Sequence, residues 1–153
     1  MSNRNTIVVH GDGVQFEALA NAAITPGQLV EEMSTGKIRK HATAGAAAQK
    51  AFALEDFLQG KTIAQDISAN NVCLYRCFRL GDEVYAILAD GENVAVGDKL
   101  ESAGGGELRK QVLTSSGAVA NPAGLIGFAR EAVDASDSKA TPVDSRRLIV
   151  RIA

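Results

Sequence analysis

Two cysteines and two histidines are the side chains best suited to nucleophilic or metal chemistry in this sequence. Cys73 and Cys77 lie in VCLYRCFR, a β-prone run. On a strand they would share a face at roughly 13 Å, beyond the roughly 7 Å between Cα atoms that a disulfide allows. His10 and His41 stand at no zinc-site spacing. We expect buried free thiols, no metal and no catalytic residue; a Cys–His hydrolase pairing is a rival without a local motif.

Two further patterns resemble functional motifs in part. Gly60-Lys61-Thr62 matches the end of a phosphate-binding loop, but that pattern needs a glycine five positions before Gly60, where the chain has Glu55. Glu31 and Glu32 are adjacent, so on a strand they face opposite ways and do not form a general acid–base pair. The sequence therefore predicts no cofactor.

Composition narrows the class of partner. The net charge is −2 with a pI of about 5.7, and lysines and arginines are scattered, which argues against nucleic acid. No apolar run approaches the roughly 18–20 residues of a membrane span, and the N-terminus lacks a secretory signal. With 153 residues the chain suits one domain, and with 5% aromatics its core must consist of Val, Ile, Leu and Ala.

The elements that position these residues follow an internal repeat. Residues 24–40, ITPGQLVEEMSTGKIRK, align without a gap with residues 94–110, VAVGDKLESAGGGELRK, a shift of 70. Both copies share the same glycines, a glutamate and an Arg-Lys pair, and their apolar positions also match. A repeat of this length indicates a duplicated β unit around one core.

The repeat and the turn signals together predict the fold. We expect a mainly β protein, a small β-barrel or sandwich of two pseudo-repeats at about 24–80 and 94–153, with at most one short helix. Residues 44–58 have a helix-forming composition, but the repeat favours a loop and then a strand from about Lys50. Residues 1–23 are divided off as an extended N-terminal arm, and residues 24–153 as a single β domain.

Two surface features could bind a partner. The repeated basic pairs Arg39-Lys40 and Arg109-Lys110 are either solvated strand ends or symmetric contacts to an acidic surface. The β-prone residues Asn5, Thr6, Ile7, Val8 and Val9 form either an ordinary first strand or an arm that adds a strand to a neighbouring chain.

Several stretches resemble a known family. GKIRK, KAFALEDFLQGKTIAQDIS, the block Gly81–Lys110, IGFAREAVDASDS and the terminal RRLIVRI are similar to the capsid decoration, or cement, proteins of tailed bacteriophages. The resemblance runs from about Ile24 to Ile152, and the block Gly81–Lys110 is its most specific part.

The resemblance implies a structural role. It implies a β-rich knob on the outer surface of the virion, made in the host bacterial cytoplasm, which binds the major capsid protein as a homo-dimer or homo-trimer. Such proteins clamp joints between capsid subunits, and Asn5–Val9 would be the capsid-binding arm by position alone. The alternative is a virion-surface receptor- or glycan-binding module, against which the scarcity of aromatic residues counts; a third is an enzyme using Cys73 or Cys77.

Overall fold

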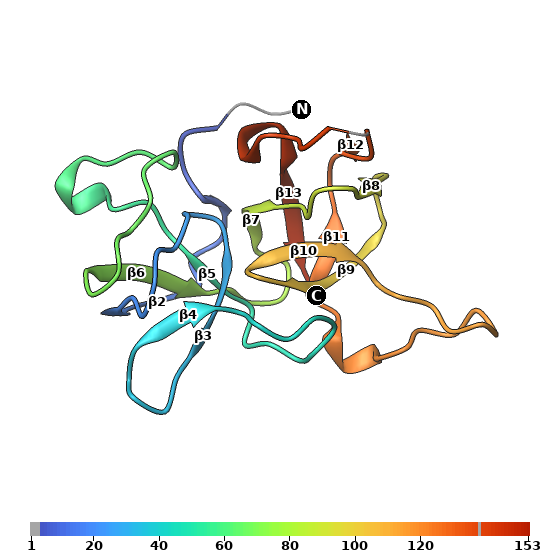
Figure 1. Cartoon of the computed structure of the whole chain (residues 1–153), viewed down its shortest axis with the longest axis horizontal. Coiled ribbons are helices and arrows are strands. Elements are labelled where there is room, and N and C mark those ends of the chain that lie inside the picture. The colour runs from blue at the N-terminus through green and yellow to red at the C-terminus, as the bar shows by residue number, and fades with distance from the viewer. Residues whose placement is uncertain (1–3, 138) are drawn as a thin grey trace.

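The computed structural model describes residues 4–137 and 139–153 as a mainly β protein, which confirms the predicted fold class (Figure 1). Every strand pairing within its sheets is antiparallel. The described residues contain no α-helix, and three short 3-10 helices lie in connections: η1 Phe57–Gln59, η2 Pro122–Gly124 and η3 Val143–Arg146.

Two sheets make up most of the fold. The five-stranded sheet has the order β2-β6-β5-β3-β4, with bounds β2 Val14–Leu19, β6 Val72–Cys77, β5 Ala51–Ala53, β3 Leu29–Glu32 and β4 Ile38–Lys40. The six-stranded sheet has the order β1-β7-β13-β11-β9-β10, with bounds β1 Val8–His10, β7 Glu83–Ile87, β13 Arg147–Ile152, β11 Gly127–Ala129, β9 Lys99–Gly104 and β10 Glu107–Lys110. A small third sheet pairs β8 Asn93–Val94 with β12 Val133–Asp134. Neither large sheet closes on itself, so the arrangement is sandwich-like and not a closed barrel.

The sheet order confirms the internal repeat. The order β2-β6-β5-β3-β4 in one sheet corresponds to β7-β13-β11-β9-β10 in the other. Equivalent hydrogen bonds follow: Gly27 N–H donates to the Ala53 carbonyl over 2.8 Å, and Gly97 N–H donates to the Ala129 carbonyl over 2.8 Å. The chain is therefore two copies of one β unit, and β1 is the strand that the second unit has in addition.

The ambiguous segment before η1 is a loop followed by a strand, as the repeat predicts. Strand β5 lies between β3 and β6 and hydrogen-bonds to both, and its Phe52 is fully buried. Pairing on both sides and burial of a large side chain outweigh the weak helix preference of the preceding alanines.

The main core lies between the two large sheets and consists chiefly of aliphatic side chains, as the composition predicts. Leu29, Phe52 and Leu74 from the five-stranded sheet join one cluster with Val84 and Leu148 from the six-stranded sheet. A second, smaller cluster lies within the first unit, around Ile24, Ile38 and other residues. The two units are therefore held together by a shared apolar core as well as by the continuous polypeptide chain.

The N-terminal segment contributes a strand to each of the two large sheets. Strand β1 pairs with β7, and β2 pairs with β6. Ile7, directly before β1, is fully buried in the main core. Residues 7–20 thus pack within the same folded unit as the rest of the chain, as the first of the two sequence interpretations expects of an ordinary first strand.

Candidate functional site

The predicted N-terminal contact residues differ in how far a partner could reach them. Asn5 and Thr6 are exposed, Val8 and Val9 are half-buried, and Ile7 is fully buried. Ile7 N–H donates to the Glu55 carboxylate over 3.1 Å, and its carbonyl accepts from Tyr85 N–H over 2.8 Å. Ile7 is therefore buried and hydrogen-bonded within its own domain, while Asn5 and Thr6 are accessible to a partner. The capsid-binding role of the segment stays a prediction.

Both repeated arginines lie in ion pairs within their own hairpins. Arg39 on β4 donates from Nε to Glu31 on β3 over 2.9 Å. Arg109 on β10 donates from Nε to Glu101 on β9 over 3.1 Å. Their positive charges are therefore compensated inside the chain, which weakens their attraction for an acidic partner.

The two repeated lysines have different surroundings. Lys110 is exposed and forms an ion pair with Asp98 at 3.1 Å. The Ala95 N–H, which donates to Asp98, and the Lys110 charge together lower the pKa of the Asp98 carboxyl. Lys40 is half-buried at the edge strand β4. The two basic pairs lie on the edge strands of different sheets, and their role in partner binding stays a prediction.

The two thiols lie on one face of β6 and are free. Burial, and secondarily the charge of Asp56, raises the pKa of Cys73 to about 12. Burial and the Glu32 charge also raise the pKa of the half-buried Cys77. A raised pKa leaves little thiolate near neutral pH, so both thiols are weak nucleophiles in the folded chain.

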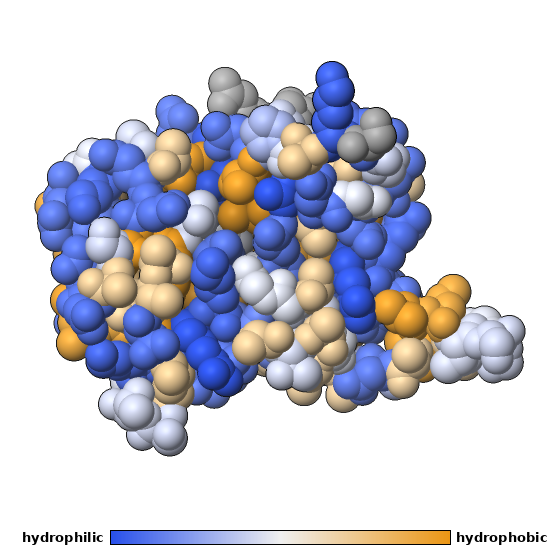
Figure 2. Space-filling model, viewed as in Figure 1, coloured by the Kyte–Doolittle hydropathy of each residue, from blue (hydrophilic) through white to orange (hydrophobic). Residues whose placement is uncertain are grey.

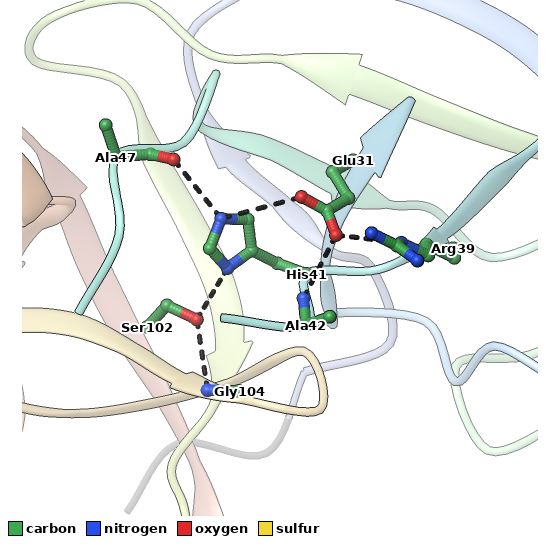
Figure 3. Close-up of polar contacts among 7 residues, drawn as sticks. All are labelled: Glu31, Arg39, His41, Ala42, Ala47, Ser102 and Gly104. Atoms are coloured by element: carbon green, nitrogen blue, oxygen red, sulfur yellow. Dashed lines mark hydrogen bonds and ion pairs between the residues drawn. The ribbon is translucent and has the colours of Figure 1, made fainter. Parts of the chain in front are cut away.

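A buried polar cluster that the sequence did not reveal joins the two units. His41 follows β4 in the first unit, and its Nδ1 lies 2.8 Å from the Ser102 hydroxyl on β9 in the second (Figure 3). On the other side of the ring, Nε2 lies 3.2 Å from the Ala47 carbonyl and 3.8 Å from the Glu31 carboxylate. His41 and Ser102 are both buried.

The surroundings of the ring fix the tautomer of a neutral His41. The Ala47 carbonyl only accepts hydrogen bonds, so Nε2 must carry the proton and donate it. Nδ1 is then an acceptor, and the Ser102 hydroxyl donates to it. That hydroxyl in turn accepts from Gly104 N–H over 3.1 Å, so Ser102 is held from both sides.

The cluster contains the residue types of a serine hydrolase, but its geometry is that of a structural joint. Ser102 has an exposed fraction of 0%, so no substrate can reach its hydroxyl in this conformation. The surrounding backbone is bonded across the same joint, because Gly106 N–H donates to the His41 carbonyl over 3.2 Å. The sequence signal for this contact was slight: His41 directly follows the repeated Arg39-Lys40 pair.

Two of the apolar features on the surface of the described residues are a projecting hairpin and strand β2. Residues 111–121 form a projecting hairpin, closed by a bridge between Leu113 and Val119, and Figure 2 shows apolar surface at its base. A hollow of about 370 Å³ lies beside it, between Lys99, Lys110 and Leu113 among others. The second feature is β2, whose Val14 and Phe16 are about half exposed, at 44% and 46%.

The described residues hold no group of three or more His, Cys, Asp or Glu side chains arranged to bind a metal. Within the same part of the chain, no helix is long and apolar enough to cross a membrane.

Comparison with known proteins gives a likeness of fold. No protein-family model and no curated protein matches the sequence. Among solved structures, the chain is similar to the N base of the head fiber protein gp8.5 of bacteriophage phi29. That match has a TM-score of 0.54 and 15% sequence identity, and covers 92% of this chain and 93% of the other.

At this identity the likeness concerns the fold. It extends over nearly the whole of both chains. The matched protein is the base of a bacteriophage head fiber.

Proposed function

We propose that this chain is a structural protein of a tailed-phage head, which binds the outer surface of the capsid and stabilises contacts between major capsid subunits. The observation that carries the proposal is the fold likeness to a head fiber base over 92% of the chain. The family resemblance from Ile24 to Ile152 supports the same class of protein independently, because it rests on residues and not on fold.

The construction of the molecule suits a clamp. Two like β units share one apolar core, and the buried His41–Ser102 contact ties them at a second place. Such a body holds its two halves in a fixed relation, which is what bridging two neighbouring subunits requires. The role is non-enzymatic, and the raised thiol pKa values agree with that because they suppress the nucleophiles of the rival enzyme hypothesis.

The capsid contact is assigned to the N-terminal end of the molecule. Asn5 and Thr6 are exposed, and β1 leaves one of its edges unpaired at the margin of the six-stranded sheet. A capsid strand added there would gain main-chain hydrogen bonds, and alternate side chains would provide specificity. A stable contact needs about 1,000 Å² or more of buried surface. Arg39 and Arg109 already form ion pairs within the chain, so the repeated pairs Arg39-Lys40 and Arg109-Lys110 would add little to that contact.

The protein acts on the virion as a homo-oligomer, after synthesis in the host cell. Several copies joined together engage several capsid subunits at once, which raises the effective concentration of each contact. A modest single interface then suffices for stable decoration of the head.

The stabilising role is tested by heating DNA-filled heads that lack this protein, with and without the purified chain. We expect the midpoint temperature of DNA release to rise and then to stop rising once the sites are full. The control is the chain unfolded and alkylated beforehand. An unchanged release temperature despite measured binding would contradict stabilisation while leaving head association intact.

A further inference from the structure

The two β units differ in what covers one strand. In the second unit β1 pairs with β7 and covers its edge. In the first unit the equivalent strand, β2, is the terminal strand of the five-stranded sheet. The position that β1 occupies beside β7 is therefore open beside β2.

The equivalence of the two strands can be followed residue by residue. Ala20 N–H, at the end of β2, donates to the Asn71 carbonyl over 2.9 Å, and Leu88 N–H, at the end of β7, donates to the Arg146 carbonyl over 2.8 Å. Ala20 therefore corresponds to Leu88. Counting back along both strands, Phe16 corresponds to Val84 and Glu17 to Tyr85.

This correspondence fixes the direction of the backbone groups of β2. Tyr85 N–H donates to the Ile7 carbonyl over 2.8 Å, which places this N–H on the edge that the β1 segment covers. The equivalent Glu17 N–H points to the open edge, and by the alternation of a strand the Gln15 N–H does so too. At the far end of β2 the same edge meets β4 through the bridge between Ala20 and Ile38. The open edge thus offers a row of ladder groups to a further strand.

The side chains of β2 are also more exposed than those of the covered strand β7. Phe16 and Leu19 are 46% and 42% exposed, whereas their equivalents Val84 and Ile87 are 0% and 1% exposed. Apolar side chains at this level of exposure on both faces of one strand indicate a surface that another polypeptide covers.

The sheet edges formed by β10 and β4 are protected against pairing. Strand β10 has a register shift and carries Arg109 and Lys110. Strand β4 has three residues, of which two are basic. By contrast β2 runs six residues in regular register with β6 and carries one charge, Glu17. Proteins rarely leave a long, regular, apolar edge strand exposed.

We propose that β2 pairs with β2 of a second copy of this chain, antiparallel about a twofold axis at Phe16, and so joins two five-stranded sheets. A twofold axis normal to the sheet leaves each side chain on the same face, and directly opposed residues in a sheet also share a face. At the axis a residue must therefore lie opposite its own copy in the partner. An axis at Glu17 would oppose two carboxylates, which is destabilising. An axis at Phe16 opposes the two phenyl rings, sets Val14 against the partner's Ala18, and sets Gln15 against the partner's Glu17.

The charges favour this register. Arg76 on β6 donates from Nη2 to the Gln15 side chain over 2.8 Å, on the same face of the sheet. The partner's Glu17 would lie on the far side of Gln15, so each copy sets its Arg76 in one row with the other's carboxylate. The register thus provides an aromatic pair on one face and a charge-complementary row on the other.

This inference rests on the proposed function only for its purpose, since it names the surface through which the head protein self-associates. It is tested on the purified chain without heads. A failure here would leave capsid binding standing, and a failure of capsid binding would leave this dimer standing.

Cysteine cross-linking tests the register. At a twofold axis on Phe16, the two Cα atoms form a non-hydrogen-bonded pair at about 4.5 Å, within the range for a disulfide. In a background of Cys73→Ala and Cys77→Ala, we expect Phe16→Cys to give, on mild oxidation, a species of twice the 16.0 kDa of the chain. The control is Glu17→Cys, whose Cα atoms would lie roughly 8–9 Å apart and so should not cross-link.

The mass in solution tests the dimer without cysteine chemistry. We expect light scattering to give a dimer for the unmodified chain and a monomer for Phe16→Lys, with an unchanged circular dichroism spectrum. Phe16 is half exposed, so the lysine is tolerated in the monomer. A monomeric or trimeric unmodified chain, a dimer that survives Phe16→Lys, or cross-linking of Glu17→Cys in place of Phe16→Cys would each overturn the proposal.

Discussion

Arg109 donates to Glu101 across the β9–β10 hairpin just as Arg39 donates to Glu31 across β3–β4, but the Glu101 side chain is 2% exposed and that of Glu31 is 28% exposed. The duplication has thus placed one ion pair in two environments within a single chain. Each half therefore supplies matched controls for substitutions in the other.

The first prediction concerns these two glutamates. Glu101 Oε1 also accepts from Val112 N–H over 3.1 Å. Glu101→Gln therefore removes the negative charge that faces Arg109 and weakens the acceptor of this second hydrogen bond, at a buried site. We expect a loss of about 1–3 kcal/mol in the free energy of unfolding, measured by urea titration. The exposed counterpart, Glu31→Gln, should lose under about 1 kcal/mol. Equal losses would show that burial does not govern the strength of the pair.

The second prediction compares two equivalent glycines. Gly27 and Gly97 have φ values of 94° and 91°, which disfavour any side chain. An added Cβ at Gly97 meets nothing within 4 Å, whereas at Gly27 it would lie 2.6 Å from Arg147 Nη1 and 2.8 Å from the Tyr85 carbonyl. We expect Gly97→Ala to cost about 1–2 kcal/mol through backbone strain alone, and Gly27→Ala to cost clearly more in the same unfolding assay. A smaller cost at Gly27 would contradict the packing described around Arg147.

The third prediction concerns acid. Because the folded state lowers the pKa of Asp98, its carboxylate stabilises the fold at pH values above its ordinary pKa of about 3.9, and this contribution disappears as the pH falls below that value. Asp98→Asn should therefore be less stable than the unmodified chain at neutral pH, and the difference should shrink in acid. The control is Gln28→Ala: Gln28 accepts the equivalent bond from Thr25 N–H over 2.8 Å without a charge, so its effect should not depend on pH in this way. A difference for Asp98→Asn that does not shrink as the pH falls below about 3.9 would contradict this.

The fourth prediction separates folding from partner binding at the N-terminus. Ile7 is fully buried, so Ile7→Ala should lower the free energy of unfolding by about 2–4 kcal/mol. Asn5→Ala, at an exposed position, should change it by no more than about 0.5 kcal/mol. Deleting residues 1–12 would remove Ile7 and β1 together and so would measure folding.

Head binding by the exposed N-terminal residues is measured with the stable variants. If the segment contacts the capsid, Asn5→Ala combined with Thr6→Ala should weaken head binding at unchanged unfolding free energy. Unchanged binding would remove these two residues from the proposed contact.

The repeat made much of the fold predictable. The shift of 70 residues located both hairpins. When gaps are allowed, the repeat also aligns Phe52-Ala53 with Phe128-Ala129, and this favoured a strand, the observed β5, where the preceding alanines favoured a helix. These features are predictable because strand pairing imposes local patterns of alternation and turn residues that a duplication preserves.

Contacts between the two units were not predictable in the same way. The His41–Ser102 contact joins residues 61 positions apart, and neither belongs to a motif. The β2 strand could have been found, because VQFEALA aligns with DEVYAIL at a shift of 68, but this alignment uses a different offset from the rest of the repeat. The position of β1 beside β7 depends on burial of Ile7, which no local pattern specifies.

The central claim is that this chain binds the outside of a phage head, and a co-sedimentation titration against purified, undecorated heads of the encoding phage tests it most directly. The account predicts saturable binding at an integer ratio to the capsid lattice, abolished when the chain is unfolded and alkylated beforehand. No binding at micromolar concentrations would contradict it and would favour the virion-surface binding module instead.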